Sequence, residues 1–77
     1  MAIYHRIRDL REDRDWTQQY LADLLQVART SYGAYETGVS EFLPAHLIQL
    51  AEIYDTSVDY LLGLTDEQAP YPRKAKR

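Results

Sequence analysis

The chain has 77 residues, of which 45% are hydrophobic and 27% charged, and it contains no cysteine. This length fits one small domain, and the composition is typical of a folded globular protein rather than a disordered segment. The lack of cysteine excludes disulfide bonds and thiolate zinc sites. No apolar run reaches the roughly 18 residues of a membrane span, and the first residues lack the apolar core of a signal peptide. We therefore expect a cytoplasmic protein with no membrane partner.

The net charge of −3 is distributed unevenly along the chain. Basic and acidic residues balance in residues 1–15. Residues 16–72 contain a single base, Arg29, against eight acidic residues, and four bases follow in residues 73–77. A broad basic surface is therefore not expected in the middle of the chain.

Two amphipathic helices are predicted in the first third of the chain. The first spans about residues 3–13, and its apolar face consists of Ile3, Ile7 and Leu10. Thr17 is a residue type that caps helix N-termini, so we expect a second helix to begin at Gln18. The apolar side of that helix is expected to contain Leu21, Leu24 and Leu25.

The third predicted helix spans residues 28–36 and carries Tyr32 and Tyr35 three positions apart. Only a short turn separates it from the second helix, and this connection is too short for antiparallel packing. The two helices are therefore predicted to form a helix-turn-helix. In that arrangement the second helix can enter the major groove of DNA while the first crosses the backbone.

Two more helices are predicted before the character of the sequence changes. Pro44 suits the first turn of a fourth helix, and Ser57 suits the cap of a short fifth helix over residues 58–62. No repeat or strand pattern interrupts the series, so the predicted fold class is all-α with five helices. We expect residues 1–65 to form the domain. Residues 66–77, rich first in proline and then in basic side chains, are expected to form an extended C-terminal tail.

Four pieces of the sequence resemble the phage-repressor (Cro/XRE) family of helix-turn-helix proteins. They are Arg6–Arg11, Thr17-Gln18 with Leu21-Ala22, Tyr35-Glu36-Thr37-Gly38, and Thr56–Gly63. Each piece alone is a weak signal, but their order and spacing over residues 3–65 are specific. The resemblance implies a five-helix, lambda-repressor-like domain that binds double-stranded DNA and regulates transcription.

In this family the outward face of the third helix contacts the bases. Tyr32 and Tyr35 are predicted to face inward. The residues left on the outward face are Arg29, Thr30, Gly33 and Ala34. Arg29 can form a bidentate contact with guanine, worth about 1–3 kcal/mol of discrimination between bases, and Gly33 lets the backbone approach the groove closely. The alternative is a solvated helix face on which Arg29 only adds solubility.

The resemblance also implies contacts with the DNA backbone. Gln18 corresponds to a phosphate-contacting residue of the family, and the N–H groups at a helix N-terminus favour an anion. Thr17, Thr37 and Ser40 are further backbone candidates. The alternative role of Thr17 is helix capping alone, and that of Thr37 and Ser40 is ordinary loop polarity.

Arg11 and Glu36 match the positions of a partly buried ion pair that joins the first and third helices in the family, and we predict this pair here.

The sequence departs from the family at Gln26, where the turn usually holds glycine; a positive φ there would cost on the order of 1 kcal/mol. A second departure is the single base between Thr17 and Ser40, which predicts modest DNA binding with a weak salt dependence. The basic tail either adds phosphate contacts or only aids solubility.

No residue pattern indicates an enzyme, a cofactor or a metal site, because His5 and His46 have no third ligand nearby in the sequence and no carboxylate lies near a nucleophile. The sequence predicts a transcriptional regulator, expected to be a repressor, that binds a pseudo-palindromic operator as a homodimer. The candidate dimer contacts are Tyr60, Leu61, Leu64 and residues 70–72. The alternative is a protein-interaction module, such as an antitoxin or another protein's regulatory partner, with weak DNA binding. The acidic middle of the chain supports that alternative.

Overall fold

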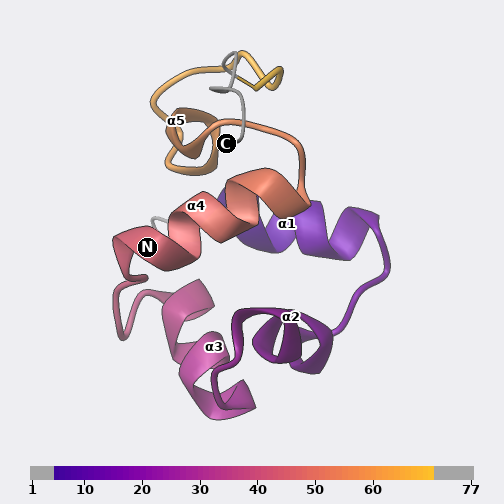
Figure 1. Cartoon of the computed structure of the whole chain (residues 1–77), viewed down its shortest axis with the longest axis vertical. Helices are drawn as coiled ribbons and strands as arrows, with labels where there is room; N and C mark the ends of the chain where they lie inside the picture. Colours follow the sequence, from indigo (N-terminus) through magenta and orange to yellow (C-terminus); the bar gives the residue numbers. More distant parts are fainter. Residues whose placement is uncertain (1–4, 71–77) are drawn as a thin grey trace, which may run out of the picture.

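The computed structural model describes residues 5–70, and over this range the chain forms five helices and no strand. The helices are α1 (His5–Asp13), α2 (Gln18–Leu25), α3 (Arg29–Thr37), α4 (Pro44–Ile53) and α5 (Val58–Leu61). The predicted all-α fold class is therefore confirmed. Figure 1 shows α2 and α3 together at one end of the molecule, α1 and α4 across its middle, and α5 at the other end. Within the described range, no helix is both long enough and apolar enough to cross a membrane.

The N-termini of three helices lie where their capping residues predict. Thr17 is extended, and its hydroxyl accepts a hydrogen bond from the N–H of Tyr20 at 3.0 Å. Ser57 does the same for α5, where it accepts from the N–H of Tyr60 at 3.0 Å. Pro44 occupies the first turn of α4, where the missing N–H costs no helical hydrogen bond. Each side-chain cap contributes about 1 kcal/mol.

The third helix is shifted by one residue from its predicted range. Ala28 is extended and precedes the helix, which therefore begins at Arg29 and runs to Thr37. Gly38 then ends it with φ of +86°, a conformation that glycine adopts without the steric strain of a side chain. The predicted end of the first helix at Asp13 is confirmed, and its expected beginning at residue 3 lies outside the described residues.

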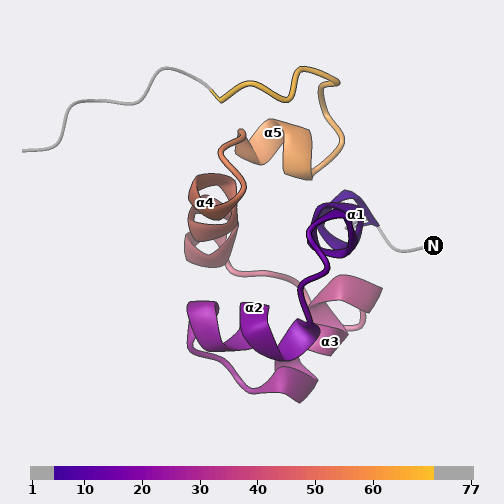
Figure 2. The ribbon, with the colours of Figure 1, turned by 90° about the vertical axis from the view of Figure 1, so that its right-hand side faces the viewer.

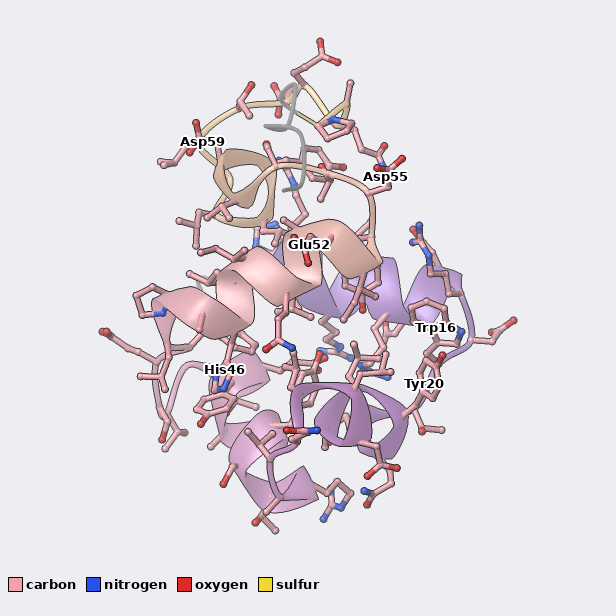
Figure 3. All side chains as sticks on the ribbon, viewed as in Figure 1. Trp16, Tyr20, His46, Glu52, Asp55 and Asp59 are labelled. Atoms are coloured by element: carbon pink, nitrogen blue, oxygen red, sulfur yellow. The ribbon has the colours of Figure 1, made fainter. Side chains whose placement is uncertain are left out.

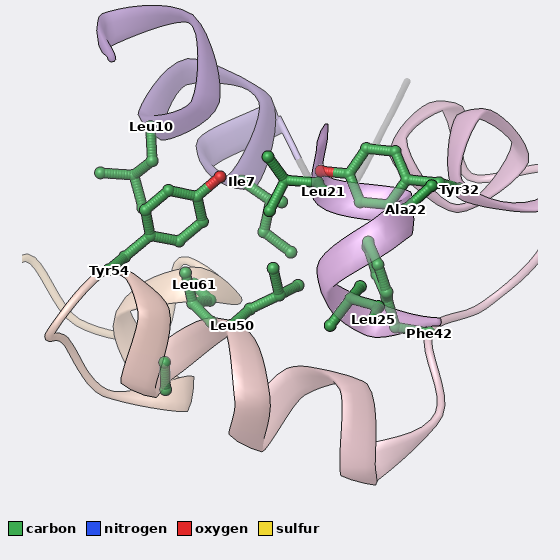
Figure 4. Close-up of a cluster of buried hydrophobic side chains, with 11 residues drawn as sticks. Ile7, Leu10, Leu21, Ala22, Leu25, Tyr32, Phe42, Leu50, Tyr54 and Leu61 are labelled. Carbon is green, nitrogen blue, oxygen red and sulfur yellow. The ribbon is translucent and has the colours of Figure 1, made fainter. Parts of the chain in front are cut away.

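One hydrophobic core lies between the helices, as Figure 4 shows. Its buried members are Ile7, Leu10, Leu21, Ala22, Leu25, Tyr32, Phe42, Leu50, Ala51, Tyr54 and Leu61. Leu24 was predicted to share the apolar side of α2 with Leu21 and Leu25, but unlike them it is not buried, since the residue is 39% exposed. The face of α2 that packs inward is centred between Leu21, Ala22 and Leu25, and this places Leu24 at its solvent edge.

Candidate nucleic-acid interface

Helices α2 and α3 form the predicted helix-turn-helix and remain side by side in both ribbon views (Figure 2). The turn depends on Gln26, whose φ of +60° lies in the left-handed region. The following residue, Val27, donates its N–H to the carbonyl of Ala22 at 2.9 Å and so closes the turn. Because Gln26 has a side chain, this backbone conformation carries the strain that the sequence predicts for a positive φ.

The two sides of α3 differ in burial. Tyr32 is fully buried, and Tyr35 is partly buried with its ring 4.9 Å from that of Phe42. The predicted inward orientation of the two tyrosines is therefore confirmed. On the remaining face, Arg29 and Thr30 are exposed, and the smaller residues Gly33 and Ala34 are half-buried.

Gln18 connects the first turn of α2 to both ends of α3. Its Nε2 donates to Oε1 of Glu36 at 3.2 Å, and its Oε1 accepts from Nη1 of Arg29 at 3.4 Å. The bare backbone of Gly33 gives this side chain room, since a Cβ there would lie 3.4 Å from the Gln18 Oε1 atom. A phosphate contact by the Gln18 side chain would therefore involve a group that already bonds to α3.

A buried ion pair joins α1 to the last turn of α3. Arg11 donates from Nε and Nη2 to the two carboxylate oxygens of Glu36, at 2.7 and 3.1 Å. The hydroxyl of Tyr32 donates to the same carboxylate at 2.7 Å, and Nη1 of Arg11 donates to the carbonyl of Trp16 at 2.9 Å. Only 2% of the Glu36 side chain is exposed, so the carboxylate exchanges water for these hydrogen bonds.

The surroundings of Glu36 keep it ionised. Burial acts to raise the pKa of Glu36, but the hydrogen bonds from Arg11, Tyr32 and Gln18 outweigh it and hold that pKa below its ordinary value. The hydrogen bond to Glu36 in turn raises the pKa of Arg11. Burial and the same carboxylate raise the pKa of Tyr32, which remains a protonated donor. This ionised hydrogen-bond network therefore holds the last turn of α3 against α1.

The other residues predicted to contact the DNA backbone lie at the ends of the helix-turn-helix. Thr17, Thr37 and Ser40 are all exposed. Thr17 uses its hydroxyl to cap α2, and Thr37 donates its hydroxyl to the carbonyl of Ala34 at 3.2 Å. The N–H of Ser40 donates to that same carbonyl at 3.1 Å, which holds the chain close to the end of α3.

A pocket of about 310 Å³ adjoins this surface, and no single segment of the sequence indicates it. Helix α1 contributes His5, Arg8, Arg11 and Glu12 to its walls. Gln18 at the start of α2 and Glu36 and Thr37 at the end of α3 also line the pocket. The only local signal is the spacing of four between Arg8 and Glu12, which predicts an ion pair but not a pocket.

The sequence profile of the helix-turn-helix family matches residues 7–61. An uncharacterized HTH-type transcriptional regulator of Bacillus subtilis, YobD, is 43% identical over 84% of this chain and 58% of its own length. The HTH-type transcriptional regulator AnsR of the same bacterium is 37% identical over 88% of this chain and 59% of its own. The cryptic phage CTXphi transcriptional repressor RstR of Vibrio cholerae is 33% identical over the whole chain and 70% of that repressor. No solved structure gives a significant match.

The chain belongs to the helix-turn-helix family of DNA-binding transcriptional regulators of the phage-repressor (Cro/XRE) type. This is a class of regulators rather than of enzymes, and the resemblance predicted from the sequence is confirmed. The chain spans about three fifths of the length of the two Bacillus relatives.

Proposed function

We propose that the protein represses transcription by binding a pseudo-palindromic operator as a homodimer through α3. The observation that carries this proposal is the exposure of Arg29 in the first turn of a helix whose opposite face is anchored in the core. A guanidinium presented in this way can donate two hydrogen bonds to O6 and N7 of guanine. The similarity to a phage repressor favours repression over activation.

Both ends of α3 are supported, and base recognition needs such support because its hydrogen bonds tolerate little displacement. The ion pair between Arg11 and Glu36 fixes the last turn of α3 to α1. The Gln18 side chain contacts Arg29 in the first turn. We propose that Thr30, Gly33 and Ala34 share the base-contacting face.

The proposal of a homodimer follows from the need to place two recognition helices on one operator. Leu61 is fully buried in the core of the single chain, so the expectation that it contacts a second subunit is withdrawn. Leu64 is 73% exposed beyond α5 and stays in the proposed interface together with Tyr60. The expected contacts of Tyr71 and Pro72 and the role of the basic tail lie outside the described residues.

The distribution of acidic residues supports DNA over a protein partner for the α3 face. Glu52, Asp55 and Asp59 lie on the side of α4 and α5, away from α3 (Figure 3). These three acidic residues therefore lie away from the α3 face, and Glu36, the acidic residue of α3, is buried in its pair with Arg11. The second candidate function is that of an antitoxin or a regulatory partner of another protein. In that case the acidic α4–α5 side would be the surface that contacts the partner.

Selection from random double-stranded DNA at low salt tests the proposed function. We expect enrichment of an inverted repeat with half-sites about 10 base pairs apart. On the enriched sequence, Arg29→Ala should weaken binding by about 5- to 150-fold, which corresponds to the loss of one bidentate base contact. Enrichment of no sequence by the wild-type protein would contradict the proposal and favour the protein-interaction alternative.

A further inference from the structure

We propose that the pocket beside the helix-turn-helix binds a phosphate of the DNA backbone and that Glu12 is an internal anion which this phosphate displaces. The inference rests on the proposed DNA binding and adds a phosphate contact from α1 to the contacts proposed for α2 and α3. The pocket has a volume of about 310 Å³ and opens between α1, the start of α2 and the end of α3.

The carboxylate of Glu12 lies between two guanidinium groups of the pocket wall. Its Oε2 atom accepts a hydrogen bond from Nε of Arg8 at 3.0 Å and lies 4.0 Å from Nη2 of Arg11. Phosphate and carboxylate oxygens favour the same guanidinium geometry. The position of Glu12 therefore marks a place where an anion is stabilised, and a phosphate entering the pocket would meet the same two arginines.

The two ion pairs of the pocket differ in how readily they can exchange partners. The side chains of Arg8 and Glu12 are 62% and 50% exposed, so solvent screens their pair and its loss costs little. Arg11 and Glu36 are only 12% and 2% exposed, and the Glu36 carboxylate has four hydrogen bonds. An incoming phosphate can therefore replace Glu12 beside Arg8, while the pair that supports α3 stays intact.

The location of the pocket fits the path that a bound duplex would take. Gln18 and Thr37, both predicted to contact the DNA backbone, line it from the ends of α2 and α3. Arg29 is the single base between residues 16 and 72, so the helix-turn-helix itself has little charge for phosphates. Arg8 brings a positive charge of α1 to the same surface, where His5 also lines the pocket.

Two charge substitutions in the pocket test the proposal. Glu12→Gln removes the competing anion and should tighten binding about 3- to 10-fold. Arg8→Gln should weaken binding by a similar factor and reduce the slope of log affinity against log salt by about 1, since one phosphate contact is lost. Both effects should be equal on the selected operator and on an unrelated duplex, because phosphate contacts carry no sequence information.

A matched control separates the pocket from the overall charge. Glu52→Gln makes the same change as Glu12→Gln at an exposed position of α4, away from α3, and should alter affinity less than twofold. Equal tightening by Glu52→Gln and Glu12→Gln would overturn the proposal, as would an unchanged salt slope in Arg8→Gln. In both cases wild-type operator binding would persist and the proposed function would stand. If the wild-type protein binds no duplex, both proposals fail. Circular dichroism checks that each variant is folded.

Discussion

Glu36 is a residue whose loss should be costly, because its carboxylate is the acceptor of a buried hydrogen-bond network. Glu36→Ala would leave the guanidinium of Arg11 and the hydroxyl of Tyr32 without their acceptor in a buried site. We expect the free energy of unfolding, measured by urea titration at pH 7, to fall by about 3–5 kcal/mol. Glu52→Ala, the same change at an exposed position of α4, should cost no more than about 0.5 kcal/mol. A loss below about 1 kcal/mol for Glu36→Ala would contradict the assigned role of the network.

The loss of stability in Glu36→Ala should depend on pH. The folded protein holds the pKa of Glu36 below the ordinary value of 4.5, so folding favours the ionised carboxylate. This contribution is fully present above pH 4.5 and is lost as the pH falls through the folded pKa. The difference in free energy of unfolding between wild type and Glu36→Ala should therefore shrink as the pH falls below 4.5. A difference that grows in acid would contradict the lowered pKa of Glu36 in the folded protein.

Gln26 is strained in the turn between α2 and α3. Its φ of +60° is disfavoured for residues with a Cβ and is readily adopted by glycine. Gln26→Gly should therefore raise the free energy of unfolding by about 0.5–1 kcal/mol, after the extra chain entropy of glycine in the unfolded state is subtracted. Thermal unfolding would show this as a higher midpoint. A lower midpoint would indicate that the Gln26 side chain makes a stabilising contact that outweighs its backbone strain.

At the scale of the helix, Gly33 separates the stability of α3 from its function. The residue lies inside the helix without a positive φ, and a Cβ would contact the Gln18 side chain, with Oε1 at 3.4 Å and Cδ at 4.0 Å. Gly33→Ala should stabilise the protein by up to about 1 kcal/mol through higher helix propensity. If the backbone of Gly33 approaches the groove closely, the same variant should bind its operator more weakly. Unfolding and affinity measurements on one sample would test this, and tighter binding would argue against close approach.

The helices were predictable from the sequence because their signals are local. Thr17, Pro44 and Ser57 each favour the start of the helix at which they lie, and Gly38 favours the end of the helix before it. The exposure of Leu24 was not predictable, because it depends on how α2 is rotated against the other helices.

The candidate site was predictable only in part. The exposed positions on α3 follow from helix periodicity once Tyr32 and Tyr35 are placed inward. The bond from Gln18 to Arg29 and the pocket beside Arg8 combine side chains from different helices, and no local pattern in the sequence indicates them.

Across the whole molecule, Arg6 joins α1 to α5 and to the segment that follows α5. Its Nη1 atom donates to the carbonyls of Tyr60 and Thr65 at 3.0 and 2.8 Å, and its guanidinium lies 4.2 Å from the centre of the Tyr60 ring. Arg6→Ala should therefore lower the free energy of unfolding by about 2 kcal/mol. Arg8→Ala on the same helix loses only an exposed pair and should cost about 0.5 kcal/mol or less. Equal losses for the two variants would contradict this role of Arg6.

The central claim is that Arg29 reads a guanine from the exposed face of α3. The most direct test measures wild type and Arg29→Ala on the selected operator and on the same operator with the contacted guanine replaced by 7-deazaguanine, which lacks the N7 acceptor. We predict that the replacement weakens wild-type binding about tenfold and leaves the affinity of Arg29→Ala unchanged. Equal weakening of both proteins at every guanine would show that Arg29 contacts no guanine N7 and would contradict the account.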